Sequence, residues 1–296
     1  MALYAFDGTF NEDKEGSEHD TNVVWFRDSY NDGTVHYWTG VGTRLGIFGK
    51  AIGGITGAGG RTRVREALKA VRENFKKGDT VIDIVGFSRG SALALHFGNT
   101  LEQGIEGHPG VPQIRFLGIW DTVPSFGIPG NPIDVGWDLD LPDNAERCFH
   151  AVALDERRHN FPLHRLEEHQ EDTSDEPRLT EVWFRGVHSD IGGGNDNAAL
   201  SSIALAWMFE AAKRANVKLK APMIAKNAAR RNPAAPISVH KFDPIKNRFP
   251  AVRTSDLVHE SVTFRQDDKD RQHNNPPNGA AKVNNGGGSA GPFVRA

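Results

Sequence analysis

A β-branched apolar run that leads directly into a glycine-flanked serine constrains this chain more than any other feature. Residues 81–85 read Val-Ile-Asp-Ile-Val and predict a buried strand, and residues 91–97 are apolar nearly all round and predict a buried helix. Between them, Gly86-Phe87-Ser88-Arg89-Gly90 is a G-x-S-x-G turn in the strand–turn–helix context that this motif requires. Ser88 is therefore expected to be a nucleophile on a strained turn. The competing interpretation is a glycine-rich turn that carries a serine by chance.

The rest of the chain supplies an α/β pattern around this turn. Alternating apolar segments predict strands and helices in succession, which is typical of a mostly parallel sheet flanked by helices. The predicted strands are residues 3–6, 35–39, 114–120, 148–154 and 181–187, and the predicted helices include residues 64–77 and 198–215. We expect residues 1–265 to form one such domain. Residues 266–296 are dominated by Asn, Gly, Asp, Pro and charged residues and are expected to be a flexible polar tail.

Composition excludes several classes of function. With 38% hydrophobic residues, the chain of 296 residues can build a globular core. A net charge of -3 gives no electrostatic footprint for nucleic acid, and no apolar run approaches the length of a membrane span. The single cysteine, Cys148, excludes an intramolecular disulfide and a cysteine-based metal cluster.

The location of the protein is predicted from two of these features. Residues 1–7 contain neither a basic region nor a cleavage site, so no secretory signal peptide is expected. One unpaired cysteine fits synthesis in a reducing cytosol. Export is then expected only by a route that needs no signal peptide.

Two further strands end in residue types that complete a nucleophilic mechanism. Asp121 follows the strand at 114–120, and His188 follows the strand at 181–187. The order Ser88, Asp121, His188 is that of an α/β-hydrolase, and carboxyl ends of parallel strands converge at one sheet edge. His188 is the expected base and Asp121 the acid that orients it. Asp155, which also follows a strand, and His259 are the alternative acid and base.

Oxyanion donors are expected at two helix or strand ends. The Arg89 backbone N–H, next to the serine, is the first candidate. The strand at 3–6 breaks at Asp7-Gly8-Thr9, and Gly8 or Thr9 is the candidate for the second donor. Asp7 has a supporting role or bonds only to nearby backbone. Asp190 orients the His188 loop, bonds to backbone in its glycine-rich turn, or has no chemical role.

Two glycine- and proline-rich loops predict the approach to the site. Residues 40–60 and 125–142 combine turn residues with apolar side chains and are expected on the rim of the site. We expect an apolar entrance for acyl chains that touches a lipid surface, against the alternative of ordinary packing. The apolar residues concerned are Leu45, Ile47, Phe48, Phe126, Ile128, Ile133 and Trp137.

Taken in order, these motifs resemble a known family. They are Asp7-Gly8-Thr9, the Ser88 turn, the Trp120-Asp121-Thr122 strand end, and the long run from Val182 through His188-Ser189-Asp190 to Gly194. Together they resemble the α/β-hydrolase domain that includes the bacterial type VI secretion phospholipase effectors of the first lipase group. The resemblance covers roughly residues 1–265. Ser91 departs from the alanine that usually follows the serine motif in that family.

The resemblance implies an ester hydrolase that cleaves phospholipid acyl chains without a cofactor or a metal. It implies Ser88, Asp121 and His188 as the triad, an acyl-ester or phospholipid substrate, and a secretion spike or an immunity protein as partner. Two other classes stay open on the residues alone. One is a metal-dependent phosphoesterase with Asp7, Asp121, His188 and Asp190 as ligands. The other is a binding module without catalysis, because fold does not fix function.

Overall fold

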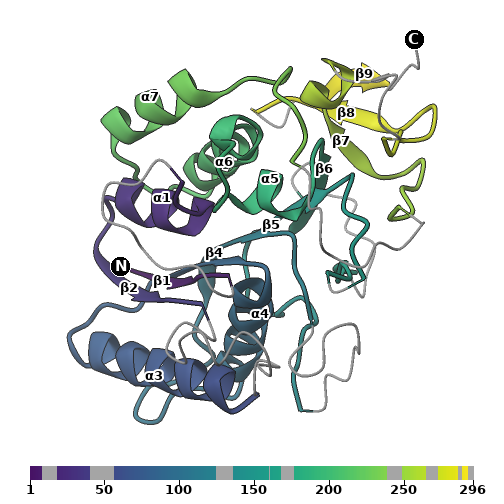
Figure 1. Ribbon diagram of the computed structural model, residues 1–296. Coiled ribbons are helices and arrows are strands. Elements are labelled where there is room, and N and C mark those ends of the chain that lie inside the picture. Colours follow the sequence, from purple (N-terminus) through teal and green to yellow (C-terminus); the bar gives the residue numbers. More distant parts are fainter. Residues whose placement is uncertain are drawn as a thin grey trace, which may run out of the picture.

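A mostly parallel sheet runs through the molecule, with helices on both faces (Figure 1). The computed structural model describes residues 1–8, 19–40, 57–124, 136–159, 161–167, 177–238, 249–264, 273–285 and 289–292. Within these residues, the strands are β1 (Ala2–Phe6), β2 (Thr34–Trp38), β3 (Ile82–Phe87), β4 (Ile114–Trp120), β5 (Cys148–Ala153), β6 (Leu179–Phe184), β7 (Leu257–His259), β8 (Ala281–Val283) and β9 (Ser289–Pro292).

The strand order places several carboxyl ends at one edge of the sheet. The order is β2-β1-β3-β4-β5-β6-β7-β8-β9, and every neighbouring pair from β2 to β8 is parallel. Only β9 runs antiparallel to its neighbour β8. The predicted α/β fold with a mostly parallel sheet is thus confirmed. Because parallel strands end on the same side, residues that follow β1, β3, β4, β5 and β6 are brought together there.

Helices cover the two faces of the sheet in separate groups. In Figure 1, α3 and α4 lie on one face, and α1, α6 and α7 lie on the other. The helices are α1 (Asn22–Ser29), α3 (Gly57–Lys76), α4 (Arg89–Leu101), α5 (His188–Gly192), α6 (Ala198–Arg214) and α7 (Ala221–Arg230), with a 3₁₀ turn at Glu260–Phe264. None of the helices in the described ranges is long and apolar enough to cross a bilayer.

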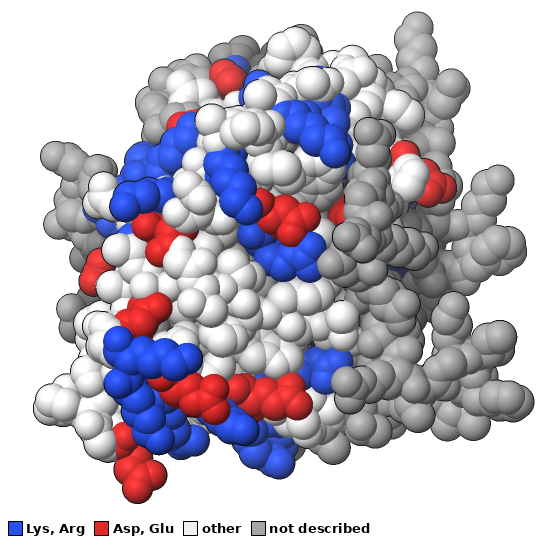
Figure 2. Space-filling model, turned by 90° about the vertical axis from the view of Figure 1, so that its left-hand side faces the viewer, with Lys and Arg blue, Asp and Glu red and all other residues white. Residues whose placement is uncertain are grey.

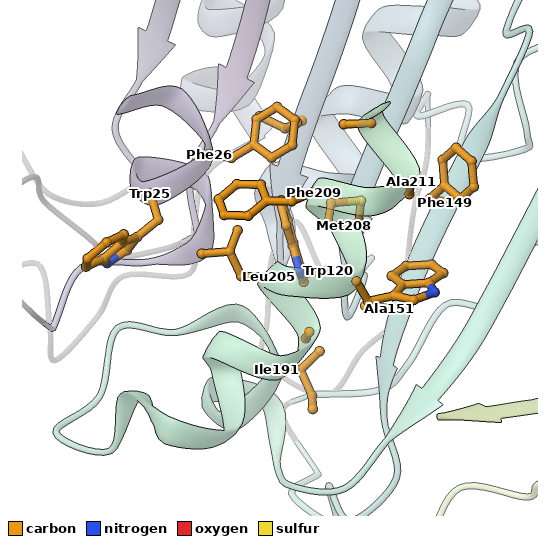
Figure 3. Close-up of a cluster of buried hydrophobic side chains, with 14 of the residues drawn as sticks. Trp25, Phe26, Trp120, Phe149, Ala151, Ile191, Leu205, Met208, Phe209 and Ala211 are labelled. Atoms are coloured by element: carbon orange, nitrogen blue, oxygen red, sulfur yellow. The ribbon is translucent and has the colours of Figure 1, made fainter. Parts of the chain in front are cut away.

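Strand alternation divides the core into two clusters. Leu3 of β1 belongs to the cluster under α1 and α6, whereas Tyr4 belongs to the cluster under α3 and α4. Successive side chains of a strand point to opposite faces, so a strand covered on both faces is apolar throughout. Figure 3 shows Phe26 of α1 and Phe209 of α6 beside Trp120, the last residue of β4. The sheet edge that carries Ser88 and Asp121 therefore rests on packed aromatic side chains.

Charged side chains of both signs share the surface. Figure 2 shows Lys and Arg mixed with Asp and Glu along the lower edge of the displayed face, the level at which α3 lies in Figure 1. On α3, Lys69 and Glu73 form an ion pair across one turn, at 3.9 Å. Exposed pairs of this kind contribute little to stability, about 0.3–0.5 kcal/mol.

The C-terminal region differs from the expectation of a flexible polar tail. Within residues 266–296, β8 pairs with β7 and β9 pairs with β8, so these residues extend the sheet. The side chain of Asn274 donates to the Leu154 carbonyl oxygen at 2.9 Å and joins this region to the end of β5. A polar segment can add strands in this way because pairing on an existing sheet edge uses backbone groups and needs little apolar side-chain area.

The last four residues of the glycine-rich loop predicted over residues 40–60 are helical. Helix α3 begins at Gly57, so its last glycines are helical, and residues 41–56 lie outside the described residues. A Cβ atom on Gly60 would lie 2.8 Å from the ring of Trp137 and 2.9 Å from Leu93 of α4. Close packing of the start of α3 thus explains this glycine, which the sequence analysis had assigned to loop mobility.

An ion-pair network at the opposite end of the strands explains the one acidic residue within β3. Asp83 is fully buried, and its carboxylate accepts hydrogen bonds from Arg115 Nε at 2.9 Å and from the Tyr30 hydroxyl at 2.7 Å. Arg115 also binds Asp32 at 2.8 Å. The network joins β3, β4 and the residues after α1.

We predict that Asp83→Ala lowers the free energy of unfolding by about 3 kcal/mol or more, because it leaves Arg115 and Tyr30 without their buried acceptor. Urea unfolding followed by circular dichroism measures this change. Asp143→Ala is the matched control, because the Asp143 side chain is 80% exposed and lies 3.6 Å from Arg178. A loss below about 1 kcal/mol for Asp83→Ala would contradict the assigned role.

Candidate active site

Ser88 lies between β3 and α4 in a strained backbone conformation. Its φ is 60° and its ψ is -125°, outside the region that most residues adopt, and its side chain is buried. The Ser88 N–H donates to the Trp120 carbonyl oxygen at 3.0 Å, and the Val123 N–H donates to the Ser88 carbonyl oxygen at 3.2 Å. These two bonds hold the turn against the end of β4. The strand–turn–helix geometry expected from the sequence is therefore present.

The two glycines of the motif are required by close backbone approach. A Cβ atom on Gly86 would lie 2.7 Å from the Gly90 carbonyl oxygen, and one on Gly90 would overlap the Phe6 carbonyl group. Helix α4 can therefore start directly against the end of β1 only without these side chains. Because α4 begins at Arg89, the Arg89 N–H is among the first amides of the helix, which have no partner within it.

The Arg89 side chain is also unusual. It is largely removed from water, and this burial lowers the pKa of its guanidinium to about 10. Its Nε atom is buried without a hydrogen-bond partner in the described part of the chain.

Asp121 follows β4 and is held rigidly. Its φ is 40°, a second strained position, and its carboxylate is buried. One carboxylate oxygen accepts the Ala153 N–H at 2.8 Å, and the other lies 2.6 Å from Nδ1 of His188. The structure thus brings together two of the residues that the sequence analysis selected for the triad.

His188 is the first residue of α5 and is almost completely buried. Its imidazole lies between two rings, with centroid distances of 4.6 Å to Phe87 and 4.8 Å to Phe161. With Nδ1 bonded to the carboxylate of Asp121, Nδ1 carries the proton and Nε2 is the basic nitrogen. Phe87 immediately precedes Ser88, so the imidazole packs against the serine turn.

Glu156 was missed by the sequence analysis. One of its carboxylate oxygens accepts the backbone N–H of His188 at 3.1 Å. Burial alone would raise the pKa of Glu156, but its hydrogen bonds to Arg158 and the charges of Arg158 and His188 hold that pKa below its ordinary value. The available signal was the charged run at residues 155–158, just after β5, but this run does not indicate which atom Glu156 contacts.

The alternative residues are occupied elsewhere. Asp155 accepts hydrogen bonds from Arg185 at 2.8 Å and from the Gly186 N–H at 2.8 Å. His259 has Nδ1 2.8 Å from the Ser261 hydroxyl and Nε2 3.0 Å from the Asn285 side chain. Neither of these side chains has a contact to Asp121 or His188 in the hydrogen bonds of the described residues.

The end of β1 differs in one respect from the expected oxyanion site. The Gly8 N–H donates to the Asp7 carboxylate at 2.7 Å, so this N–H becomes an oxyanion donor only after that bond breaks. Asp7 also accepts bonds from Thr21 at 2.9 Å and Tyr37 at 2.7 Å. Burial raises the pKa of Asp7 to about 6, although these bonds oppose the increase. Thr9, the other candidate donor, lies outside the described residues.

Asp190 holds the loop that carries His188. Its carboxylate accepts the Val187 N–H at 3.1 Å, the Ser238 hydroxyl at 2.6 Å and the Asn195 amide at 3.0 Å. Burial raises the pKa of Asp190 despite these bonds. Because Asp190 also accepts the Ser238 N–H at 3.0 Å, these contacts fit both of the structural roles considered from the sequence, orienting the His188 loop and bonding to backbone.

The carboxylates considered as metal ligands do not form one donor set. Asp7 bonds with Thr21 and Tyr37, whereas Asp190 bonds with Ser238 and Asn195. Across the described ranges, no group of three or more His, Cys, Asp or Glu side chains is placed to hold a metal ion.

The expected apolar entrance is described only at Trp137. This ring packs against the core cluster of α3 and α4, 4.8 Å from the His96 ring and 5.5 Å from the Arg61 guanidinium. The other apolar residues proposed for the entrance lie outside the described residues: Leu45, Ile47, Phe48, Phe126, Ile128 and Ile133.

We predict that His259 makes stability depend on acid pH. Burial lowers its pKa from 6.5 to about 4, so the unfolded chain binds this proton more tightly. The stabilisation is fully present above pH 6.5 and is lost as pH falls toward 4, by roughly 3 kcal/mol in total. Urea unfolding at several pH values between these limits gives the free energy of unfolding as a function of pH. For His259→Gln, this free energy should change less with pH than it does for the wild type. His19→Gln, whose side chain is 56% exposed, should keep the wild-type slope; equal slopes for all three proteins would disprove the assignment.

Comparisons with known proteins relate this geometry to a family. The family model "T6SS, Phospholipase effector Tle1-like, catalytic domain" matches residues 3–103 and 101–211, which include Ser88, Asp121 and His188. A search of curated proteins found no match.

Two solved structures are similar to this chain. One is an uncharacterized protein from Pseudomonas aeruginosa, with 22% identity and a TM-score of 0.51 over 77% of this chain and 48% of that chain. The other is the Tle1 effector bound to the VgrG spike of the type VI secretion system, with 25% identity and a TM-score of 0.45 over 66% of this chain and 51% of that chain. This chain therefore matches about half the length of each.

The first solved structure supports the fold. The family assignment comes from the family model, whose two matched segments together cover residues 3–211 of the 296, well over half of the chain. The chain belongs to the family of type VI secretion phospholipase effectors, Tle1-like, in which it matches the catalytic domain.

Proposed function

We propose that this chain is a serine ester hydrolase that removes acyl chains from phospholipids. Ser88 attacks the ester carbonyl carbon, and Nε2 of His188 accepts the serine proton. Asp121 holds the imidazole in the tautomer with the proton on Nδ1 and stabilises its charged form. His188 then gives the proton to the leaving alcohol. Water, activated by the same imidazole, releases the acyl group and regenerates Ser88.

The oxyanion of each tetrahedral intermediate is stabilised at the start of α4. The Arg89 N–H is the first donor, because it is one of the amides at the start of α4 that have no partner within the helix. The second donor comes from the end of β1, from Thr9 or from Gly8 after its bond to Asp7 breaks. In this scheme, side chains and backbone amides of the chain carry the proton transfers and stabilise the oxyanion.

One observation supports this proposal more than any other. The Asp121–His188 bond of 2.6 Å joins the ends of β4 and β6, and the Ser88 turn is bonded to the end of β4. Among the described non-glycine residues, only Ser88, Asp121 and Asn216 have positive φ values, and the first two lie at this junction. Strained residues persist where the surrounding structure fixes them, which is common at functional sites.

The family suggests the biological setting. Because the family consists of type VI secretion phospholipase effectors, we propose phospholipid as the substrate and export by that secretion system. A secretion spike and an immunity protein are then the expected partners. The metal-dependent and binding-only alternatives find no specific support in the contacts described above.

The nucleophile is tested by Ser88→Ala. This variant should keep the fold and lose hydrolysis of p-nitrophenyl butyrate, and a fluorophosphonate probe should label the wild type at Ser88 but not the variant. Ser91→Ala is the matched control, because the Ser91 hydroxyl donates to the Trp120 carbonyl oxygen at 3.0 Å and has no proposed chemical role. The proposal is falsified if Ser88→Ala retains wild-type turnover. Loss of wild-type activity with a chelator would instead favour the metal-dependent class.

The general base is tested by a pair of histidine variants. His188→Ala should lower kcat by on the order of a thousandfold or more, since Ser88 is a weak nucleophile without a base. His259→Ala should have a far smaller effect on kcat at pH 8, because its ring nitrogens contact Ser261 and Asn285. Steady-state kinetics on the same ester gives both kcat values. A reversal of the two effects would show that the histidines are wrongly assigned.

A further inference from the structure

A pocket of about 370 Å³ lies beside the proposed active site. Its wall comes from four segments: the residues that follow β5, the residues around Phe161, Trp183 of β6, and the residues around Phe249. The wall combines arginine side chains with apolar side chains and one glutamate. Such a lining suits a ligand that has an anionic group and a hydrocarbon portion.

The pocket shares two residues with the surroundings of His188. Phe161 lines the pocket, and its ring lies 4.8 Å from the His188 imidazole. Glu156 also lines the pocket and accepts the His188 N–H at 3.1 Å. A molecule in the pocket is therefore separated from the imidazole by little more than one aromatic ring.

Three of the four arginines that line the pocket already have carboxylate partners. Arg158 binds Glu156 at 2.8 Å. Arg165 binds both Glu181 and Asp256 at 2.7 Å. The third, Arg253, lies on the exposed rim, 3.8 Å from the Glu167 carboxylate.

Arg157 is the exception. No ion pair joins it to a carboxylate within the described ranges, and its Nε atom is buried without a hydrogen-bond partner there. Its guanidinium lies 4.8 Å from the centre of the Phe249 ring, in a cation–π contact. A guanidinium that packs on an aromatic ring and has no carboxylate partner within the described ranges is suited to bidentate bonding with a phosphate group.

The position of this pocket agrees with the proposed mechanism. His188 gives its proton to the leaving alcohol, and when a phospholipid loses an acyl chain the leaving alcohol is the glycerol that bears the phosphate headgroup. A phosphate site therefore belongs on the His188 side of the serine. We propose that this pocket binds the phosphate diester of a glycerophospholipid headgroup, with Arg157 as the residue that selects phospholipids over neutral lipids. This inference rests on the proposed function.

The test compares two lipids with identical acyl chains, phosphatidylglycerol and diacylglycerol, in micelles of a nonionic detergent. The measured quantity is the ratio of their kcat/KM values. Arg157→Gln should lower this ratio roughly tenfold to a hundredfold through a higher KM for phosphatidylglycerol, since it removes one charge-assisted phosphate contact. Arg157→Lys keeps the positive charge, so its ratio should lie between those of Arg157→Gln and the wild type. Arg72→Gln, which removes one exposed arginine of α3, should leave the ratio unchanged.

A second pair of variants covers the case in which Arg157→Gln fails to fold. Ala251 is exposed and lines the same pocket, so its substitution leaves the core intact. Ala251→Glu places a carboxylate near the phosphate site and should lower the ratio, whereas Ala251→Gln, of similar size, should lower it much less. Equal ratios for these two variants would overturn the assignment of the pocket.

The remaining outcomes separate this inference from the proposed function. If the wild type cleaves p-nitrophenyl butyrate but shows no preference for phosphatidylglycerol, or if Arg157→Gln keeps the wild-type ratio, the phosphate site is overturned and the esterase function stands. If the wild type cleaves none of the three esters, both are overturned. Inorganic phosphate that changes p-nitrophenyl butyrate hydrolysis in the wild type, but not in Arg157→Gln, would assign the pocket to a free anion and overturn the headgroup site.

Discussion

The hydrogen bonds that tie the Ser88 turn to the end of β4 determine the geometry of the whole site. Ser88 and Asp121 belong to different strands, yet the Ser88 N–H donates to the carbonyl oxygen of Trp120, the residue just before Asp121. Both residues have positive φ values, and the cost of that strain, of order 1–3 kcal/mol each, must be offset by the packing around them. The parallel register of β3 and β4 and the aromatic side chains beneath Trp120 supply that packing.

Asp121 and Asp155 follow neighbouring strands, and one carboxylate oxygen of each accepts a backbone N–H. The partners of the other carboxylate oxygen differ. Asp121 accepts the Ala153 N–H beyond β4, and Asp155 accepts the Gly186 N–H beyond β5, so each carboxylate satisfies backbone of the next strand. The second oxygen of Asp121 faces His188, whereas Asp155 is further bonded to Arg185 and to the Asn274 N–H. Both oxygens of Asp155 are thus bonded to groups other than His188, and this separates the two candidate acids physically.

The sequence predicted the elements that depend on local pattern and missed those that depend on distant partners. The strands before Ser88 and Asp121 are continuous apolar runs, and covered parallel strands produce such runs. The pairing of β8 and β9 uses backbone groups, so their composition carried no signal. Gly60 was predicted to lie in a loop because the residue that requires a glycine there, Trp137, is distant in the sequence. The roles of Glu156 and Asp7 likewise depend on which backbone N–H donates to each carboxylate, and the sequence does not show this.

The bond between Asp155 and Asn274 also affects when the residues beside His188 reach their final structure during synthesis. It joins residues 119 positions apart, and contacts of such long range form late because the intervening chain must first be made and closed into a loop. Glu156 and Arg157 follow Asp155 directly, so the segment that borders His188 acquires its final support only after residue 274 has left the ribosome. A nascent chain that already contains Ser88 and Asp121 would therefore still lack a fixed wall beside His188 until residue 274 has emerged.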